Sequence, residues 1–153
     1  MLLAIFTTIL ISASPSLGQP RTAPDCREYL ERSGDQPVDL QNGRRQFSAC
    51  LRCHTLAPRG NHKTGPNLYG IVGAPIGRFE DYNYSTALKS HKGIWTISNL
   101  NKWLERPAAF IPRTRMVFSG IRSERDRRDV IGYLICHDHP DIISELVRAA
   151  EKK

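Results

Sequence analysis

The sequence predicts an all-α fold, and three observations support this prediction. Segments 39–51, 96–107 and 124–136 repeat apolar residues at the spacing of a helix. No segment of any length alternates polar and apolar residues as a half-buried strand does. Between residues 55 and 94 regular periodicity mostly disappears, and glycine and proline recur. The expected fold therefore consists of helices joined by long irregular loops.

Capping residues and apolar faces justify the helices of the first half. Residues 25–32 form a short candidate helix. Asp39 or Asn42 can cap the next helix, which runs through Phe47 to residue 51 and brings an apolar face with it. A short helical piece is expected near residues 85–89, inside the otherwise irregular stretch.

The helices of the second half have clearer boundaries. Thr96 or Ser98 opens a helix that closes at Pro107. A serine then precedes a helix over 124–136, whose apolar residues share one side. Pro140 begins a last amphipathic helix, in which the inward residues are Ile142, Ile143, Leu146, Val147 and Ala150.

The charge balance restricts the classes of partner. A chain of 153 residues is long enough for one domain of ordinary size, and its formal net charge is +7. A basic balance points to an acidic partner, a membrane surface or nucleic acid. The arginines of segment 122–128 alternate with acidic residues and lack interleaved aromatics, so they are typical of a solvated helix face. Nucleic acid is therefore not expected as a partner.

Residues 1–18 have the composition of a secretory signal peptide. They contain no charged side chain, and an apolar run over 2–13 is followed by small and turn-forming residues. The alternative is an uncleaved membrane anchor, but a spanning helix needs about twenty residues and this run has about a dozen. Cleavage before Gln19 predicts a mature chain of 19–153 in the periplasm or an equivalent exported compartment.

Two of the four cysteines lie in the pattern Cys50-Leu51-Arg52-Cys53-His54. The C-x-x-C-H pattern is typical of covalent c-type haem attachment. A helical spacing of three brings both thiols to one face, where each can add to a haem vinyl group, and His54 can then reach the iron. The alternatives are a redox pair, half of a zinc site, or chance. A zinc site needs further ligands nearby, and no second C-x-x-C or H-x-x-x-H appears.

The second axial ligand is the next question, because iron in electron-transfer haems is usually held by His and Met or by two His. The chain has two methionines, and Met1 leaves with the signal peptide. Met116 is then the available thioether, in a loop between two expected helices. The alternative is a methionine that fills a gap in the core.

Several motifs resemble class I c-type cytochromes of the mitochondrial and alphaproteobacterial type. The resemblance runs from about Gly43 to Leu134, with the motifs in order and at similar spacing. The motifs are Gly43-x-x-x-Phe47, Cys50–His54, His62–Leu68, Tyr84-Ser85, Trp95, Trp103-Leu104-x-x-Pro107, Ile111-Pro112-x-Thr114-x-Met116-x-Phe118-x-Gly120 and Tyr133-Leu134.

The resemblance implies a class I cytochrome c fold wrapped around one covalently attached haem c. It implies that His54 and Met116 are the axial iron ligands and that the Pro66 carbonyl orients the His54 ring. It also implies that the first and last core helices cross at Gly43 and Tyr133, since only glycine permits such close backbones. The residues that it places around the haem are Pro66, Tyr84, Trp95, Trp103 and Thr114.

Five positions depart from the family's usual pattern. Trp103 stands where tyrosine is usual beside the methionine ligand, and indole has no hydroxyl. Leu88 replaces a polar residue near the haem, and Ala74 replaces a basic residue that commonly supports a propionate. Ala108 and Ala109 replace lysines of the docking face. The basic residues that remain near the expected haem edge are Arg44, Arg52, Lys63, Arg113, Arg115 and Arg122.

The function implied by the resemblance is that of a one-electron carrier and not of an enzyme. Expected partners are acidic redox proteins such as a quinol–cytochrome c reductase, a terminal oxidase or a periplasmic dehydrogenase. The chain is expected to be a monomer, and it is expected at a membrane surface only through these partners. Two alternatives stay open. The chain could be a dedicated haem subunit of a larger dehydrogenase, or weak Met116 ligation could make it a peroxidase or gas binder.

Cys26 and Cys136 remain once the haem takes two cysteines. Paired thiols are expected in an exported chain, so a disulfide between them is predicted, with two unpaired thiols as the alternative. The expected organisation is a signal peptide (1–18), an N-terminal extension (19–40), a cytochrome c domain (41–136) and a C-terminal helical extension (137–153).

Overall fold

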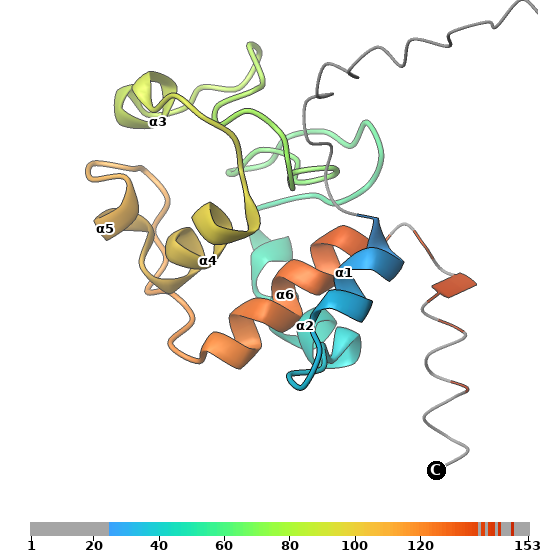
Figure 1. Cartoon of the computed structure of the whole chain (residues 1–153). Helices are drawn as coiled ribbons and strands as arrows, with labels where there is room; N and C mark the ends of the chain where they lie inside the picture. The colour runs from blue at the N-terminus through green and yellow to red at the C-terminus, as the bar shows by residue number, and fades with distance from the viewer. Residues whose placement is uncertain (1–24, 138, 140, 143, 145–147, 149–153) are drawn as a thin grey trace, which may run out of the picture.

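The computed structural model describes residues 25–137, 139, 141, 142, 144 and 148. Segment 1–18, which was expected to be a signal peptide, lies outside these residues, as does most of the last helix expected after Pro140. Six α-helices and a short 3₁₀ turn follow one another in the described chain (Figure 1). They are α1 (Cys26–Arg32), α2 (Leu40–Phe47), η1 (Cys50–Arg52), α3 (Thr86–Ser90), α4 (Ile97–Glu105), α5 (Pro107–Phe110) and α6 (Glu124–Cys136).

Among the described residues the only β-type pairing is an isolated antiparallel bridge between Pro75 and Ile94. The all-α prediction is thus confirmed. Within the same residues, no helix combines the length and the apolar character needed to cross a membrane.

Side-chain caps start five of the helices. The capping residues are Asp25, Asp39, Ser85, Thr96 and Ser123, and each accepts a hydrogen bond from a backbone N–H in the first turn of its helix. Of the alternatives left open by the sequence, Asp39 and not Asn42 caps α2, and Thr96 and not Ser98 caps α4.

Two helix boundaries differ from the prediction. The helix that was expected to continue to residue 51 ends at Phe47, because the Ser48 hydroxyl donates to the Arg45 carbonyl (2.7 Å) and the chain tightens into η1. The short helix α5 was not predicted. Pro107 occupies its first turn, a position where the missing N–H costs nothing, so the same proline ends α4 and starts α5.

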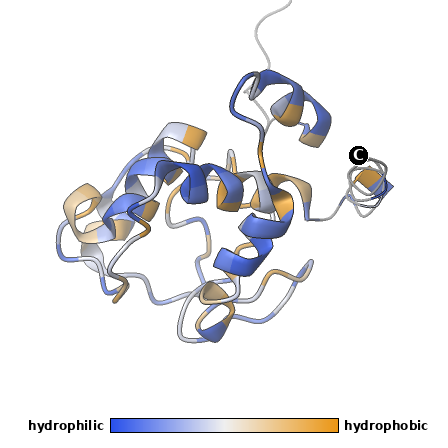
Figure 2. Ribbon diagram, turned by 90° about the horizontal axis from the view of Figure 1, so that it is seen from below, coloured by the Kyte–Doolittle hydropathy of each residue, from blue (hydrophilic) through white to orange (hydrophobic). Residues whose placement is uncertain are grey.

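The core forms where α2 crosses α6. A Cβ atom on Gly43 would lie 2.1 Å from the Asp129 carbonyl oxygen and 3.0 Å from Tyr133 Cβ, so the two backbones touch at this glycine. The Phe47 and Tyr133 rings pack beside the crossing, 5.5 Å apart. Figure 1 shows α6 at the centre, with α1, α2 and α4 around it. Hydrophobic and hydrophilic residues alternate around these helices (Figure 2), as expected of amphipathic helices.

A buried carboxylate locks the crossing in register. Asp129 is fully buried and accepts hydrogen bonds from the Asp39 N–H (2.9 Å) and the Asn42 amide (2.8 Å). Two residues earlier in α6, Arg127 donates to the Asn101 side chain (2.7 Å) and so connects α6 with α4. The buried polar groups find their hydrogen-bond partners inside the fold, and these hydrogen bonds favour one arrangement of α2, α4 and α6.

Helix α1 packs against the outer side of α6. The sulfur atoms of Cys26 and Cys136 lie 2.13 Å apart, at bonding distance, and both residues are fully buried. A Cβ atom on Gly132 would lie 2.4 Å from a methyl group of Val38 and 3.2 Å from the Tyr29 ring. The absence of a side chain at Gly132 therefore makes room on α6 for the N-terminal segment.

Gly43→Ala tests the helix crossing. The new methyl group would overlap a backbone carbonyl that cannot rotate away, so we expect the free energy of unfolding to fall by about 2–3 kcal/mol. Gln46→Ala, an exposed change in the same helix, should shift it by less than about 0.5 kcal/mol. Urea unfolding of both variants measures the difference, and equal stability of the two would contradict a tight crossing.

Candidate functional site

The residues Cys50, Cys53 and His54 lie on the tight turn that follows α2. The N–H groups of Cys53 and His54 both donate to the Cys50 carbonyl, at 3.0 and 2.9 Å. This turn presents two unbonded thiols, one half-buried at Cys50 and one exposed at Cys53. Burial raises the pKa of the Cys50 thiol. Two free thiols and an imidazole therefore share one short segment of chain.

The His54 ring is held in one orientation and one tautomer. It is 8% exposed, and its Nδ1 donates to the Pro66 carbonyl oxygen at 2.7 Å. Since Nδ1 carries the proton, the lone pair of Nε2 is available to a ligand. Burial lowers the pKa of His54, which favours the neutral form that binds a metal.

Gly65 is the residue that lets the chain pass over the imidazole. A Cβ atom at this position would lie 2.3 Å from the His54 Cε1 atom, far inside van der Waals contact. The Gly65 N–H donates to the Cys53 carbonyl at 2.7 Å, which ties the segment 65–66 back to the thiol turn. The close approach of a bare backbone thus supports the hydrogen bond from His54 to Pro66.

A buried amide holds the loop in place after His54. The Asn67 side chain is 4% exposed and donates to the Thr55 hydroxyl (2.7 Å) and the Ala57 carbonyl (3.0 Å). Its backbone N–H donates to Nδ1 of His62 (3.0 Å), and the other ring nitrogen of His62 lies 3.3 Å from Asp81. The sequence analysis assigned Asn67 no role of its own. The feature that could have indicated one is an amide side chain that lies between two glycine- and proline-rich segments.

A group of aromatic side chains belongs to the core cluster against which Cys50 packs. Tyr84, Trp95 and Trp103 are buried, and the two indole rings lie 5.3 Å apart. Phe110, from the unpredicted helix α5, completes the group at 6.3 Å from Trp95 and 6.4 Å from Trp103. Leu88 is also buried in this cluster. The set supplies the kind of apolar, aromatic surroundings that a flat aromatic group packs against.

Met116 lies in the loop between α5 and α6 and packs, half-buried, against the core cluster. Its N–H donates to the Thr114 hydroxyl at 3.3 Å, so the two residues share one turn. Arg113 begins that turn with a φ of 66°, a conformation that side chains rarely adopt. The next residue, Val117, is completely exposed.

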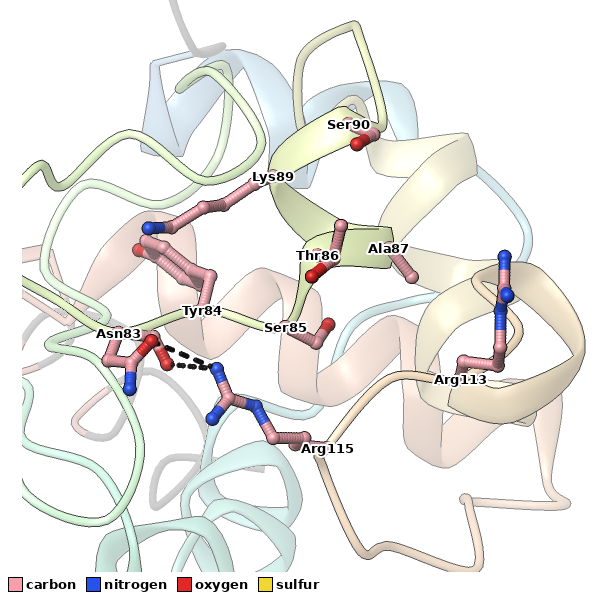
Figure 3. Close-up of a pocket in the computed structure, with 9 residues that line it drawn as sticks. All are labelled: Asn83, Tyr84, Ser85, Thr86, Ala87, Lys89, Ser90, Arg113 and Arg115. Atoms are coloured by element: carbon pink, nitrogen blue, oxygen red, sulfur yellow. Dashed lines mark hydrogen bonds between the residues drawn. The ribbon is translucent and has the colours of Figure 1, made fainter.

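A pocket of about 840 Å³ separates this loop from α3 (Figure 3). Arg115 reaches across it and donates to the backbone and side-chain oxygens of Asn83, at 2.7 and 3.2 Å. The remaining lining residues are Tyr84, Ser85, Thr86, Ala87, Lys89, Ser90 and Arg113. The Arg115 contact, which the sequence did not reveal, fastens the Met116 loop to the segment that carries Tyr84.

These groups fit the requirements of a haem c. Two unpaired thiols lie one turn apart for thioether bonds, and a neutral imidazole with a free Nε2 follows directly. A thioether comes from a separate loop, and buried aromatic side chains supply the apolar wall. A free lone pair opposite a bound Nδ1 is also what a histidine ligand to iron requires.

Comparisons with known proteins agree with this fit. No family model matches the chain. It is 40% identical over 107 residues to a cytochrome c homolog of Bradyrhizobium diazoefficiens, which covers 69% of the chain and 58% of the relative. It is 38% identical over 86 residues to cytochrome c of Kluyveromyces lactis, covering 56% of the chain and 78% of that protein. It is 43% identical over 97 residues to cytochrome c of Theileria parva, covering 63% and 84%.

Proposed function

Because this chain belongs to the cytochrome c family, which carries one covalently attached haem c, we propose that it is a one-electron carrier of an exported compartment. The haem supplies a single iron that alternates between the ferrous and ferric states. The observation that carries the proposal is the His54–Pro66 hydrogen bond of 2.7 Å, which leaves Nε2 free directly after two unpaired thiols. The chain performs no bond chemistry on a substrate.

Each residue of the site then has a separate role. Cys50 and Cys53 would hold the haem through thioether bonds, and His54 and Met116 would bind its iron. Pro66 keeps the imidazole oriented through its carbonyl. A neutral sulfur ligand would favour the reduced iron.

The buried aromatic side chains would exclude water from the haem. Tyr84, Trp95 and Trp103 would line the haem site, and Thr114 would cover the side of it from which Met116 comes. A dry pocket makes nearby charges more effective than they are in water, so the protein can adjust the redox potential with few groups. The proposal is supported by the burial of all three aromatic residues.

The partners that we propose are acidic redox proteins of a respiratory chain. Candidates are a quinol–cytochrome c reductase or a periplasmic dehydrogenase as donor, and a terminal oxidase as acceptor. A net charge of +7 favours encounter with acidic surfaces by long-range steering. The exposed Ala108 and Ala109 contribute no charge to this steering. We assign it to arginines of the Met116 loop, which include Arg113 and Arg115.

We also propose that Cys26 and Cys136 form a disulfide in the exported protein. Their Cα atoms are 4.9 Å apart, inside the range that a disulfide spans. The bond would join the N-terminal extension to the end of α6, across 110 residues of sequence. Because the disulfide would close a long loop, it would remove a large amount of conformational entropy from the unfolded chain.

The haem assignment predicts covalent colour. Expressed with periplasmic haem-ligation machinery, the protein should be red and keep its haem through acid–acetone extraction, because two thioether bonds survive denaturation. Cys50→Ala/Cys53→Ala should lose the haem in the same extraction, whereas Cys26→Ala/Cys136→Ala should keep it. Haem that extracts from the wild type contradicts the proposal.

The Met116 assignment predicts a change in redox potential. Met116→His should lower the midpoint potential, by an amount on the order of 100 mV, because imidazole donates more charge than a thioether. The iron should remain low-spin with six ligands. Met116→Ala should open the site to carbon monoxide. Optical redox titration and carbon monoxide difference spectra provide the measurements.

A core-packing role for Met116 makes the opposite prediction. Met116→Ala would then cost about 2–5 kcal/mol of stability through a cavity and leave the spectrum and potential of the iron unchanged. An unchanged potential in Met116→His would transfer the ligand role to another side chain.

The disulfide prediction concerns stability and mass. Cys26→Ala/Cys136→Ala should lower the free energy of unfolding by about 4–5 kcal/mol on the loop-closure estimate. The oxidised wild type, alkylated without reduction, should carry no alkyl group on either residue. Two alkyl groups in the mass spectrum would show that the thiols are unpaired.

A further inference from the structure

Arg78 places a half-buried cation in the loop that precedes Tyr84. Its guanidinium donates to the Gly70 carbonyl at 2.7 Å and also to the Tyr69 carbonyl. It lies over the Phe79 ring, 4.5 Å from the ring centroid. Two carbonyls and an aromatic face therefore fix the position of a charged group that sequence reasoning did not single out.

This cation has no anionic partner in the part of the chain that the structure describes. The ion pairs found there involve other residues. The Arg78 Nε atom is shielded from solvent and has no hydrogen-bond acceptor among the described residues. Burial lowers the pKa of Arg78, and the neighbouring Tyr84 opposes that effect. A half-buried cation whose Nε–H is shielded from water and has no acceptor is costly, so a missing anion is indicated.

The haem of the proposed function brings suitable anions, since it carries two carboxylates on one edge. Arg78 is electrostatically coupled to Tyr84, which belongs to the buried wall of the pocket. Ala74, four residues earlier, has an uncharged side chain. Its carbonyl oxygen accepts a hydrogen bond from the Trp95 N–H (2.8 Å). The basic residue expected at Ala74 by resemblance is thus absent, while a guanidinium arrives from Arg78.

Resting on the proposed function, we propose that Arg78 is the internal counter-charge of the haem carboxylates and a determinant of the redox potential of the iron. A fixed cation in a dry pocket stabilises the reduced state, which is one charge less positive than the oxidised state. The guanidinium would also offset the negative charge of the carboxylates. Because its position is fixed, it is less mobile than the ammonium group of a surface lysine. Lys89, which lies beside Tyr84 in Figure 3, is exposed and therefore screened by solvent.

The test compares three variants of the haem-loaded protein. Arg78→Gln removes the charge and keeps an amide donor, and Arg78→Lys keeps the charge. Arg32→Gln makes the same change in net charge at an exposed position in α1, distant from α3 in Figure 1. Optical titration gives the equilibrium constant for reduction by a fixed mediator, and circular dichroism reports the fold.

We expect Arg78→Gln to lower that equilibrium constant by about three- to tenfold. Arg78→Lys should restore most of the loss, and Arg32→Gln should change the constant by less than about 1.5-fold. Equal shifts in Arg78→Gln and Arg78→Lys would assign Arg78 a bracing role only and overturn the proposal. No shift in a haem-loaded Arg78→Gln protein would also overturn it.

Proton NMR of the ferrous wild type supplies a reading that needs no substitution. The Arg78 Nε–H proton should exchange slowly and show a nuclear Overhauser effect to the methylene protons beside a haem carboxylate. Absence of that contact would overturn the proposal even if Arg78→Gln failed to fold. Failure of the wild type to bind haem covalently would instead contradict the proposed function.

Discussion

One hydrogen bond, from His54 Nδ1 to the Pro66 carbonyl, organises the site. It selects the tautomer in which Nε2 is free, and it can form only because Gly65 has no side chain to meet the ring. Asn67 and His62 then hold the following loop against residues 55–57 and 81. A long irregular segment thus takes its order from polar contacts around one imidazole, without regular secondary structure.

The helices serve this loop by providing a rigid base. Helix α2 leads into the thiol turn, and its position depends on α6 through Gly43 and the buried Asp129. The N-terminal helix α1 adds a further layer on α6, where Gly132 leaves space for Val38. The tight helix crossing therefore fixes the end of α2, from which the thiol turn with the cysteines and His54 begins.

Features that depend on neighbouring residues in the sequence could be predicted, whereas contacts between distant segments could not. Helix α6 and its serine cap follow directly from capping chemistry and apolar spacing, and C-x-x-C-H identified the thiol turn. Helix α5 and the early end of α2 were missed because a four-residue helix has no periodicity and because the Ser48 hydroxyl competes with helix hydrogen bonds. Arg78, Phe110 and the Arg115–Asn83 contact join segments distant in sequence, so no local pattern marks them.

The cysteines differ sharply in their access to solvent. Cys26 and Cys136 are fully buried, Cys50 is half-buried and Cys53 is exposed. Thiol–disulfide exchange requires a thiolate to approach a sulfur atom, so reagents in solution act first on the accessible pair. In the folded chain a reductant can therefore keep the Cys50 and Cys53 thiols reduced while leaving the Cys26 and Cys136 sulfurs untouched. The fold thereby sorts four chemically identical side chains into two sets that differ in their access to solvent.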